Sequence, residues 1–337
     1  MTEIPDPLSP EALAGLVATA LVRHGAGDAQ AAAVGRTVAA AERDGAESHG
    51  LFRLPGYVAS LRSGKVDGAA DPELTSPAPA VLAVDARLGF APLALELGIP
   101  ALVERARETG IAALAVRNCF HFAALWPEVE AIAERGLVGL AMTAATPMVA
   151  PAGGAKPFFG TNPLAFAFPR ADGSVMAFDQ ASAAMARGDI MIAARDGAAV
   201  PEGVGIDPQG HPTMDPAAIL AGAQLPFGGY KGASIALMIE LLAGAVAGDL
   251  FSIEAGAVDN GDGGPPRGGE LVIALDPDRF GHGTAWRARS EAFLEQLLAI
   301  EGTRLPGSRR HVRRAQALSQ GITLSPVNRA ALTDLLA

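Results

Sequence analysis

The chain has 337 residues, of which 50% are hydrophobic and 18% charged, and it carries a formal net charge of −10 at pH 7. A chain of this length and composition can bury a large core and is expected to divide into two or more lobes. The acidic balance argues against broad nucleic-acid binding, and the single cysteine, Cys119, excludes an internal disulfide and a thiolate metal cluster.

No segment of the chain predicts export or membrane insertion. Residues 1–10 are acidic and interrupted by prolines, whereas a signal peptide has a basic segment followed by an apolar one. The longest apolar run, 232–248, carries Glu240 near its centre, so we predict a buried helix there. We therefore expect a cytoplasmic protein with no membrane partner.

Helical signals dominate the chain up to about residue 65. Ser9 followed by Pro10 is a typical helix start, because proline is favoured at the first helical position. Apolar residues at helical spacing continue this signal at Leu13, Leu16, Val17 and Leu21. We predict a helical N-terminal segment.

After Gly64 the pattern changes to an alternation of short apolar runs and helical runs. The apolar runs predict buried strands at 81–84, 111–116, 137–142, 164–168, 175–178 and 271–275. The helical runs lie at 92–108, 125–135, 231–247, 286–300 and 308–319. This alternation predicts an α/β fold with a mixed sheet, and the glycine- and proline-rich stretch 257–269 predicts a long loop.

The segment 41–57 places an imidazole and a guanidinium four residues apart, at His49 and Arg53. On a helix these positions share a face, so both side chains would line one cleft. Arginine binds a carboxylate through two parallel hydrogen bonds, and histidine exchanges a proton near neutral pH. The pair therefore suits proton-coupled chemistry on a small carboxylic acid.

A plainer interpretation of the same segment stays open. Ser48 could be a helix N-cap, with His49 in the first turn and Arg53 a surface charge. Pro55 cannot donate an amide inside a helix, so the helix must kink or begin again there.

Several common catalytic patterns are absent from the sequence. It has no Gly-x-Gly-x-x-Gly, no nucleotide-triphosphatase loop and no His-Glu-x-x-His, so we predict neither a Rossmann domain nor a metal site. A serine hydrolase based on Ser48 and His49 is disfavoured, because adjacent helical residues do not face each other.

Four further segments could form a site. A predicted strand ends and a helix begins in 117–125, where free backbone amides could hold an anion near His121. For His121 alone, a capping or packed histidine is the favoured interpretation. Turn-rich loops lie at 153–163 and 227–232, and either could be structural. Asp179 and Asp189 lie at the ends of the segment 178–189, where each could simply cap a helix.

Arginines are crowded near the C-terminus, at Arg304, Arg309, Arg310, Arg313 and Arg314. They could form a solvated helix face or a site for a phosphate-bearing ligand, which guanidinium groups bind well.

Taken in order, five segments resemble the malate/L-lactate dehydrogenase family that lacks a Rossmann fold, over nearly the whole chain. They are 41–57, 117–125, 153–163, 178–189 and 227–232. The resemblance implies a homodimeric, nicotinamide-dependent oxidoreductase with a non-Rossmann NAD(P)-binding domain.

Within that family, the segments 121–126, 179–180, 186–189 and 265–269 look most like the imine-reductase branch. The branch implies NADPH-dependent reduction of Δ1-piperideine-2-carboxylate to L-pipecolate and of Δ1-pyrroline-2-carboxylate to L-proline. Malate- and lactate-type members usually have a glycine after the His-Phe pair and an Ala-Thr-Ser run after the aspartate, which this chain lacks. Imine reductases tend to have serine where this chain has Ala181, which weakens one cofactor contact.

The resemblance also implies roles for individual residues. His49 would be the proton donor with Ser48 and Asp189 as its relay partners, and Arg53 and Thr161 would bind the substrate. The implied cofactor contacts are His121, Phe122, Ala123, Ala124, Leu125, Asp179, Gln180, Ala181, Tyr230, Lys231, Arg304, Arg309 and Arg310. The arginine-rich segment fits a 2′-phosphate, so NADPH is expected over NADH.

We expect three regions. Residues 1–75 would form a helical segment with the catalytic pair, 76–283 an α/β region for cofactor and substrate, and 284–337 C-terminal helices packed back on the N-terminal segment. Two alternatives remain for the function. One is a dehydrogenase of malate, L-lactate or a ureidoglycolate-type 2-hydroxy acid, which the same residues would serve, and the other is a ligand-binding homologue without catalysis.

Overall fold

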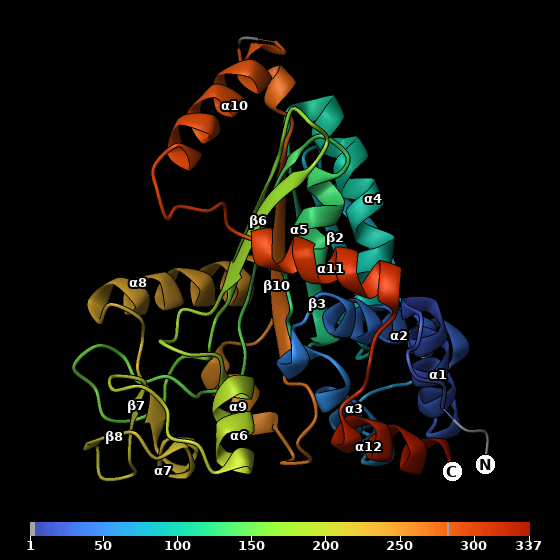
Figure 1. The fold of residues 1–337 in the computed structure, drawn as a ribbon, viewed down its shortest axis with the longest axis vertical. Helices are drawn as coiled ribbons and strands as arrows, with labels where there is room; N and C mark the ends of the chain where they lie inside the picture. The colour runs from blue at the N-terminus through green and yellow to red at the C-terminus, as the bar shows by residue number, and fades with distance from the viewer. Residues whose placement is uncertain (1–3, 282) are drawn as a thin grey trace.

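A computed structural model describes residues 4–281 and 283–337 (Figure 1). The predicted helical start is confirmed, because helix α1 (Pro10–Arg23) has Ser9 as its N-cap, whose hydroxyl accepts a hydrogen bond from the Ala12 amide at 3.1 Å. Helix α2 (Asp28–Arg43) packs against α1. Two short 3₁₀ turns, η1 (Glu47–His49) and η2 (Leu51–Arg53), then lead into α3 (Leu54–Arg62).

The middle of the chain alternates strands and helices as predicted. Its elements are β1 (Glu73–Ala78), β2 (Val81–Asp85), α4 (Ala91–Thr109), β3 (Ile111–Phe120), α5 (Trp126–Ala133), β4 (Val138–Thr143), β5 (Leu164–Pro169), β6 (Val175–Gln180) and α6 (Arg187–Asp196). The remaining elements are β7 (Gly205–Ile206), β8 (Pro212–Thr213), α7 (Pro216–Ala221), β9 (Ala223–Gln224), α8 (Tyr230–Ile239), the π-helical segment η3 (Glu240–Val246), α9 (Ser252–Val258), β10 (Arg267–Leu275), η4 (Pro277–Arg279), α10 (Ala285–Leu298), α11 (Ser308–Gln320) and α12 (Pro326–Leu336).

The main sheet has seven strands in the order β1-β2-β3-β10-β4-β5-β6, with β2 and β3 parallel and the other neighbours antiparallel. The predicted α/β fold with a mixed sheet is therefore confirmed. Strand β10, late in the sequence, lies between β3 and β4 at the centre. A second, three-stranded sheet has the order β8-β7-β9.

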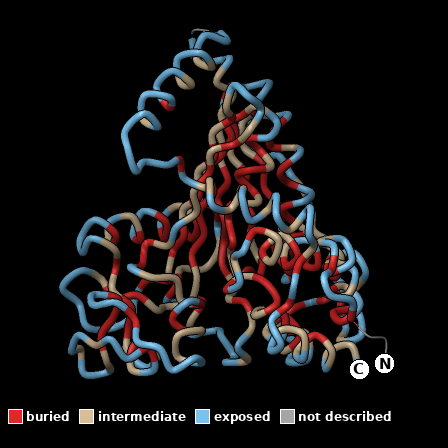
Figure 2. Tube along the Cα trace, viewed as in Figure 1, coloured by how far each residue is buried: buried red, intermediate tan, exposed pale blue. Residues whose placement is uncertain are grey.

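Successive side chains of a strand point to opposite faces of the sheet, and each face has its own core. Figure 2 shows that many residues along the sheet are buried. On one face, Val272 of β10 belongs to a cluster that includes Leu102 of α4 and Ile132 of α5. On the other face, the neighbouring Leu271 packs in a cluster with Ala243 of η3. Both faces of the sheet are therefore covered.

The helix predicted at 231–247 is only partly correct. Helix α8 ends at Ile239, and the chain continues as the π-helical segment η3. Such segments are rare and are frequently found at functional sites. Glu240, the charged residue in the longest apolar run, is the first residue of η3 and is buried.

The C-terminal helices lie in two different environments. Helix α12 contacts α1 and α3, and Leu332 is buried in the same core as the N-terminal helices. Helix α10 projects from the end of the main sheet in Figure 1, where the ring centres of Phe168 and Trp286 lie 5.5 Å apart, and Phe293 on it is 67% exposed. Within the described residues, none of the helices combines the length and apolarity that a bilayer crossing needs.

Candidate active site

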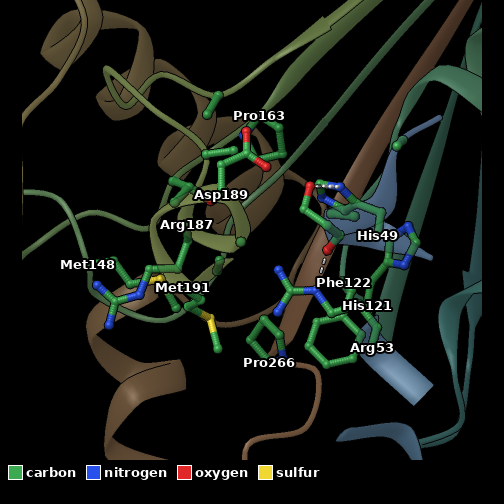
Figure 3. Close-up of a pocket in the computed structure, with 18 of the residues that line it drawn as sticks. His49, Arg53, His121, Phe122, Met148, Pro163, Arg187, Asp189, Met191 and Pro266 are labelled. Carbon is green, nitrogen blue, oxygen red and sulfur yellow. Dashed lines mark hydrogen bonds between the residues drawn. The ribbon is translucent and has the colours of Figure 1, made fainter. Parts of the chain in front are cut away.

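A cavity of about 730 Å³ lies between the N-terminal helices, the ends of the sheet strands and α6 (Figure 3). The predicted residues that line it are Ser48, His49, Arg53, His121, Phe122, Ala123, Thr161, Asp179, Gln180, Ala181, Asp189 and Arg310. Segments far apart in the sequence therefore meet in one place.

The expectation that His49 and Arg53 share one α-helix is wrong. His49 ends η1 and Arg53 ends η2, and Gly50 separates the two turns. A Cβ atom on Gly50 would lie 2.2 Å from Glu42 Oε1, and that oxygen accepts a hydrogen bond from the Leu51 amide at 2.7 Å. The chain turns tightly around the Glu42 carboxylate, and both side chains still reach the cavity.

The predicted effect of Pro55 is confirmed. Helix α3 begins at Leu54 with Pro55 in its first turn, where no amide donor is needed. Ser48 does not cap a helix; it lies within η1, and its hydroxyl is 3.2 Å from His49 Nδ1.

Arg53 is held rigidly at the cavity wall. Its Nε donates to the Ser48 carbonyl at 2.7 Å, and its guanidinium lies 4.6 Å from the centre of the Phe122 ring. Burial lowers the pKa of Arg53 to about 10, which still leaves it charged at neutral pH. Among the described residues, no carboxylate forms an ion pair with it, so its charge is available to a ligand.

His49 is buried beside this cation. Desolvation, together with the nearby charges of Arg53 and His121, lowers the pKa of His49 to about 3. The imidazole is therefore neutral at pH 7. Its ring also lies edge-on to Trp126, with ring centres 6.4 Å apart.

Helix α6 brings Asp189 to the cavity wall opposite. The close approach depends on Gly188, because a Cβ there would lie 2.8 Å from both Arg53 Nη2 and Ser48 Cβ. In the part of the chain that the structure describes, no hydrogen bond joins the Asp189 carboxylate to His49. The relay between them therefore stays a prediction.

The predicted anion site in 117–125 is occupied by the protein itself. The amides of Leu125 and Trp126 donate to Asp179 Oδ2 at 2.8 and 3.3 Å, so these donors at the start of α5 already have a carboxylate partner. Burial nevertheless raises the pKa of Asp179 to about 6. The expectation that these amides are free for a ligand is wrong.

A buried acid cluster behind this wall was not predicted. His121 Nε2 lies 3.4 Å from Glu128 Oε1 and 3.8 Å from Glu270 Oε2, and all three side chains are buried. Burial raises the pKa of Glu270 to about 8 and that of Glu128 well above its ordinary value, and it lowers the pKa of His121. Both acids therefore favour the neutral form at pH 7.

Not every predicted cofactor contact lines this cavity. Ala124 and Leu125 are buried next to it. Arg304 is exposed shortly before α11, and Arg309 is exposed on α11. Tyr230 and Lys231 are exposed at the start of α8. Arg310 does line the cavity, but its Nη1 donates to Glu130 at 3.0 Å.

Some lining residues were not assigned a role from the sequence. The clearest are Trp126, Met148, Arg187, Met191 and Gly264. Arg187 donates to the Leu220 carbonyl at 3.2 Å, and burial lowers its pKa. Arg187 belongs to the segment 186–189, which carried the family resemblance, and this membership is the sequence signal that could have identified it as a site residue.

The chain is similar to known proteins over nearly its full length. The malate/L-lactate dehydrogenase family model matches residues 8–333. The chain is 49% identical over 308 residues to a Δ1-pyrroline-2-carboxylate reductase of Ancylobacter novellus, covering 90% of each. It is 49% identical over 318 residues to a Δ1-pyrroline-2-carboxylate/Δ1-piperideine-2-carboxylate reductase of Pseudomonas aeruginosa, covering 94% of this chain and 95% of the relative.

A solved structure agrees with these relatives. The crystal structure of Δ1-piperideine-2-carboxylate reductase from Pseudomonas syringae pathovar tomato matches with a TM-score of 0.94 and 43% identity. The match covers 98% of this chain and 100% of that chain.

Proposed function

Because the chain belongs to the malate/L-lactate dehydrogenase family, we propose that it reduces the cyclic imino acids Δ1-pyrroline-2-carboxylate and Δ1-piperideine-2-carboxylate to L-proline and L-pipecolate. It is a nicotinamide-dependent oxidoreductase, as its family and its named relatives are. The observation that carries the proposal is that His49 and Arg53 line the same cavity. The relatives, which are named for these substrates, indicate the substrate class.

Arg53 is suited to hold the substrate carboxylate. Its planar guanidinium matches a carboxylate through two hydrogen bonds, and the stacking on Phe122 keeps the plane fixed. Fixing the carboxylate sets the orientation of the imine carbon beside it, and orientation of this kind lowers a reaction barrier.

His49 is suited to deliver the proton that the imine nitrogen takes up. A buried imidazole with a lowered pKa gives up its proton readily once it is charged. The carboxylate of a bound substrate adds a negative charge beside the imidazole, which raises its pKa and favours the charged form. Ser48, 3.2 Å from Nδ1, orients the ring, and we assign Asp189 as the further relay group.

The residues in the cavity fit a nicotinamide cofactor, which would supply a hydride to the imine carbon. The cavity volume of about 730 Å³ is in the range of cofactor sites, and its wall combines the apolar Phe122 with polar groups at His121 and Gln180. We propose that these residues and Asp179 hold the cofactor.

We propose NADPH over NADH because arginines of α11 lie beside the cavity. Arg310 lines it, its sequence neighbour Arg309 is exposed, and guanidinium groups bind phosphate well. Replacing both with alanine should raise the KM for NADPH more than the KM for NADH. The control is Arg36→Ala, which removes an exposed arginine of α2. An unchanged ratio of the two KM values would remove the phosphate assignment.

We further propose a homodimer. Apolar side chains of α8 and η3 face solvent, with Leu237 48% and Leu241 50% exposed, and Phe293 of α10 is 67% exposed. Apolar side chains exposed on neighbouring turns, as on α8 and η3, are the kind of surface that an interface covers. Sedimentation analysis of the purified protein measures the state directly.

The deciding experiment measures NADPH consumption by purified protein with each of the two cyclic imines, and with pyruvate and oxaloacetate at matched concentrations. Preference for the imines supports the proposal. Preference for the keto acids would move the activity to 2-hydroxy acid dehydrogenation. No consumption with any of the four would favour another substrate or a protein without turnover.

A further inference from the structure

The turn that carries Thr161 is tied to a buried carboxylate outside the cavity. Thr161 lies between Gly160 and Asn162, just before β5, and Thr161 and Pro163 line the cavity wall. Asn162 is fully buried with φ 39°, a left-handed conformation that asparagine tolerates better than most residues. The turn therefore has a shape that needs support from its surroundings.

That support comes from Glu240, the first residue of η3. Glu240 Oε1 accepts a hydrogen bond from Asn162 Nδ2 at 2.8 Å and another from the Ser252 hydroxyl, and Oε2 accepts from the Ser252 amide at 2.9 Å. The Ser252 hydroxyl in turn accepts from the Gly160 amide at 2.9 Å. The hydrogen bonds of one carboxylate thus reach the residues on both sides of Thr161.

The backbone of Thr161 itself is held from the other direction. Its carbonyl accepts hydrogen bonds from the amide and the hydroxyl of Ser182, both at 2.9 Å. Ser182 follows the segment 179–181, which also lines the cavity. With its neighbours and its carbonyl fixed, Thr161 keeps freedom only in the side chain that faces the cavity.

A carboxylate is the group that this network requires. Glu240 is 5% exposed, and among the described residues it has no cation partner, so its burial costs free energy unless its oxygens receive donors. All three neighbouring groups are donors, namely the Asn162 amide, the Ser252 amide and the Ser252 hydroxyl. A glutamine at this position would place its NH2 group against one of these donors, and two donors cannot form a hydrogen bond with each other.

We infer that Glu240 is a positioning residue for the reaction, which fixes the turn 160–163 so that the Thr161 hydroxyl meets the substrate. The inference rests on the proposed function, because it takes Thr161 as a substrate contact. It gives the π-helical start of η3 a purpose, since that segment carries the carboxylate to the back of the active-site wall.

The first test is the kinetics of Glu240→Gln. An interaction made equally in the bound substrate and the transition state affects KM and leaves kcat alone. We expect the KM for the imine to rise about tenfold, with kcat and the KM for NADPH changed by less than about twofold. The matched control is Glu254→Gln, an exposed glutamate on the neighbouring helix α9, which should leave all three constants unchanged.

A double-mutant cycle separates positioning from a general loss of stability. Thr161→Ala alone should raise the KM, and adding Glu240→Gln to it should have little further effect, because both act through the same hydroxyl. Additive effects would overturn the inference. If Glu240→Gln does not fold, Ser252→Ala removes the tether to Gly160 and replaces it in the cycle.

A crystal structure of Glu240→Gln provides a readout that does not depend on activity. We expect the Thr161 hydroxyl to move by about 0.5 Å or more, the scale at which a site loses its geometry. An unmoved turn together with a wild-type KM would refute the positioning role. If the wild-type protein reduces neither imine, the proposed function fails, and the position of Thr161 in the variant still decides whether Glu240 fixes the turn.

Discussion

Substitution of His49 tests directly whether this residue donates the proton in the proposed imine reduction. Its imidazole is neutral and buried, and Ser48 and Arg53 lie beside it. Proton donation is the one role that we assign to it. A positioned general acid typically contributes about 10²- to 10⁴-fold to a rate, so His49→Ala should lower kcat by a factor in that range. Binding of NADPH, followed by fluorescence titration, should stay within about twofold.

The control for that measurement is His211→Ala, which removes an exposed histidine near the small sheet. Turnover of His49→Ala within a few-fold of the wild type would remove His49 from the mechanism.

Glu270 predicts a pH dependence of stability. Its pKa is about 8 in the folded protein, against an ordinary value of 4.5, so the folded state binds more protons than the unfolded state between these pH values. The free energy of unfolding of the wild type should therefore fall as the pH rises from about 4.5 to 8. The neighbouring ionisable groups are His121, Glu128 and Asp179.

Glu270→Gln removes this ionisation. Relative to the wild type, the variant should gain stability as the pH rises from 5 to 9, by a few kcal/mol at most, measured by urea unfolding at each pH. A difference that is constant across this range would show that Glu270 does not titrate as its burial predicts.

The types of the residues and their order in the sequence predicted much of the candidate site, but they did not predict which ionisable side chains are buried beside it. The spacing of His49 and Arg53 indicated a shared cavity, which exists, although the helix assumed for it does not. Glu128 and Glu270 had no local signal, because they come from α5 and β10 and meet only in the folded protein. The roles of Tyr230 and Lys231, which are exposed outside the cavity, stay predictions.

The two 3₁₀ turns make a prediction at the level of elements. Gly50 allows η1 and η2 to pass close to Glu42, so Gly50→Ala forces the Glu42 carboxylate away from the Leu51 amide. The variant should lose about 1–3 kcal/mol of unfolding free energy, the usual cost of overpacking a buried site. Thermal or urea unfolding measures it.

Gly15→Ala is the matched control for that variant. Gly15 is exposed in α1, and an added Cβ meets no atom within 4 Å, so alanine should stabilise the helix by about 0.5–1 kcal/mol. Equal stability of the two variants would show that the Glu42 contact does not constrain the turns.

Strands with a continuous apolar run were predictable, and strands without one were not. All six predicted strands exist because each is buried on at least one face, whereas β1 is mostly exposed and contains Pro77. Helices α6, α7, α9 and α12 were missed, since they are short or half-exposed and carry weak apolar periodicity. The bounds of the three proposed regions stay predictions.

At the scale of the whole molecule, Arg314 links α11 to both sides of the active site. Its guanidinium bonds to Asp44 of the N-terminal segment at 2.9 Å through Nε and to Glu130 of α5 at 2.5 Å through Nη2. Asp44 also accepts a hydrogen bond from Trp126 at 3.0 Å. Helix α11 thus supplies a cation that two buried acids share, in addition to Arg43, which pairs with Asp44 at 2.7 Å, and Arg310, which pairs with Glu130 at 3.0 Å.

Arg314→Met keeps the length of the side chain and leaves those acids without this partner. We expect a loss of about 1.5–3 kcal/mol of unfolding free energy at neutral pH, because both acids lose charge-assisted hydrogen bonds while Asp44 keeps Arg43 and Glu130 keeps Arg310. Arg313→Met, an exposed neighbour on α11, should cost less than about 0.5 kcal/mol. Equal losses would show that α11 is not held by this ion pair.

The central place of β10 has a consequence for synthesis on the ribosome. Until residues 267–275 leave the exit tunnel, β3 and β4 lack the strand that joins them, so both carry unpaired backbone edges. A nascent or prematurely ended chain that stops before residue 267 therefore displays two open edges that can pair with other chains. Such fragments should aggregate and depend on chaperones, while the full-length product closes its own sheet.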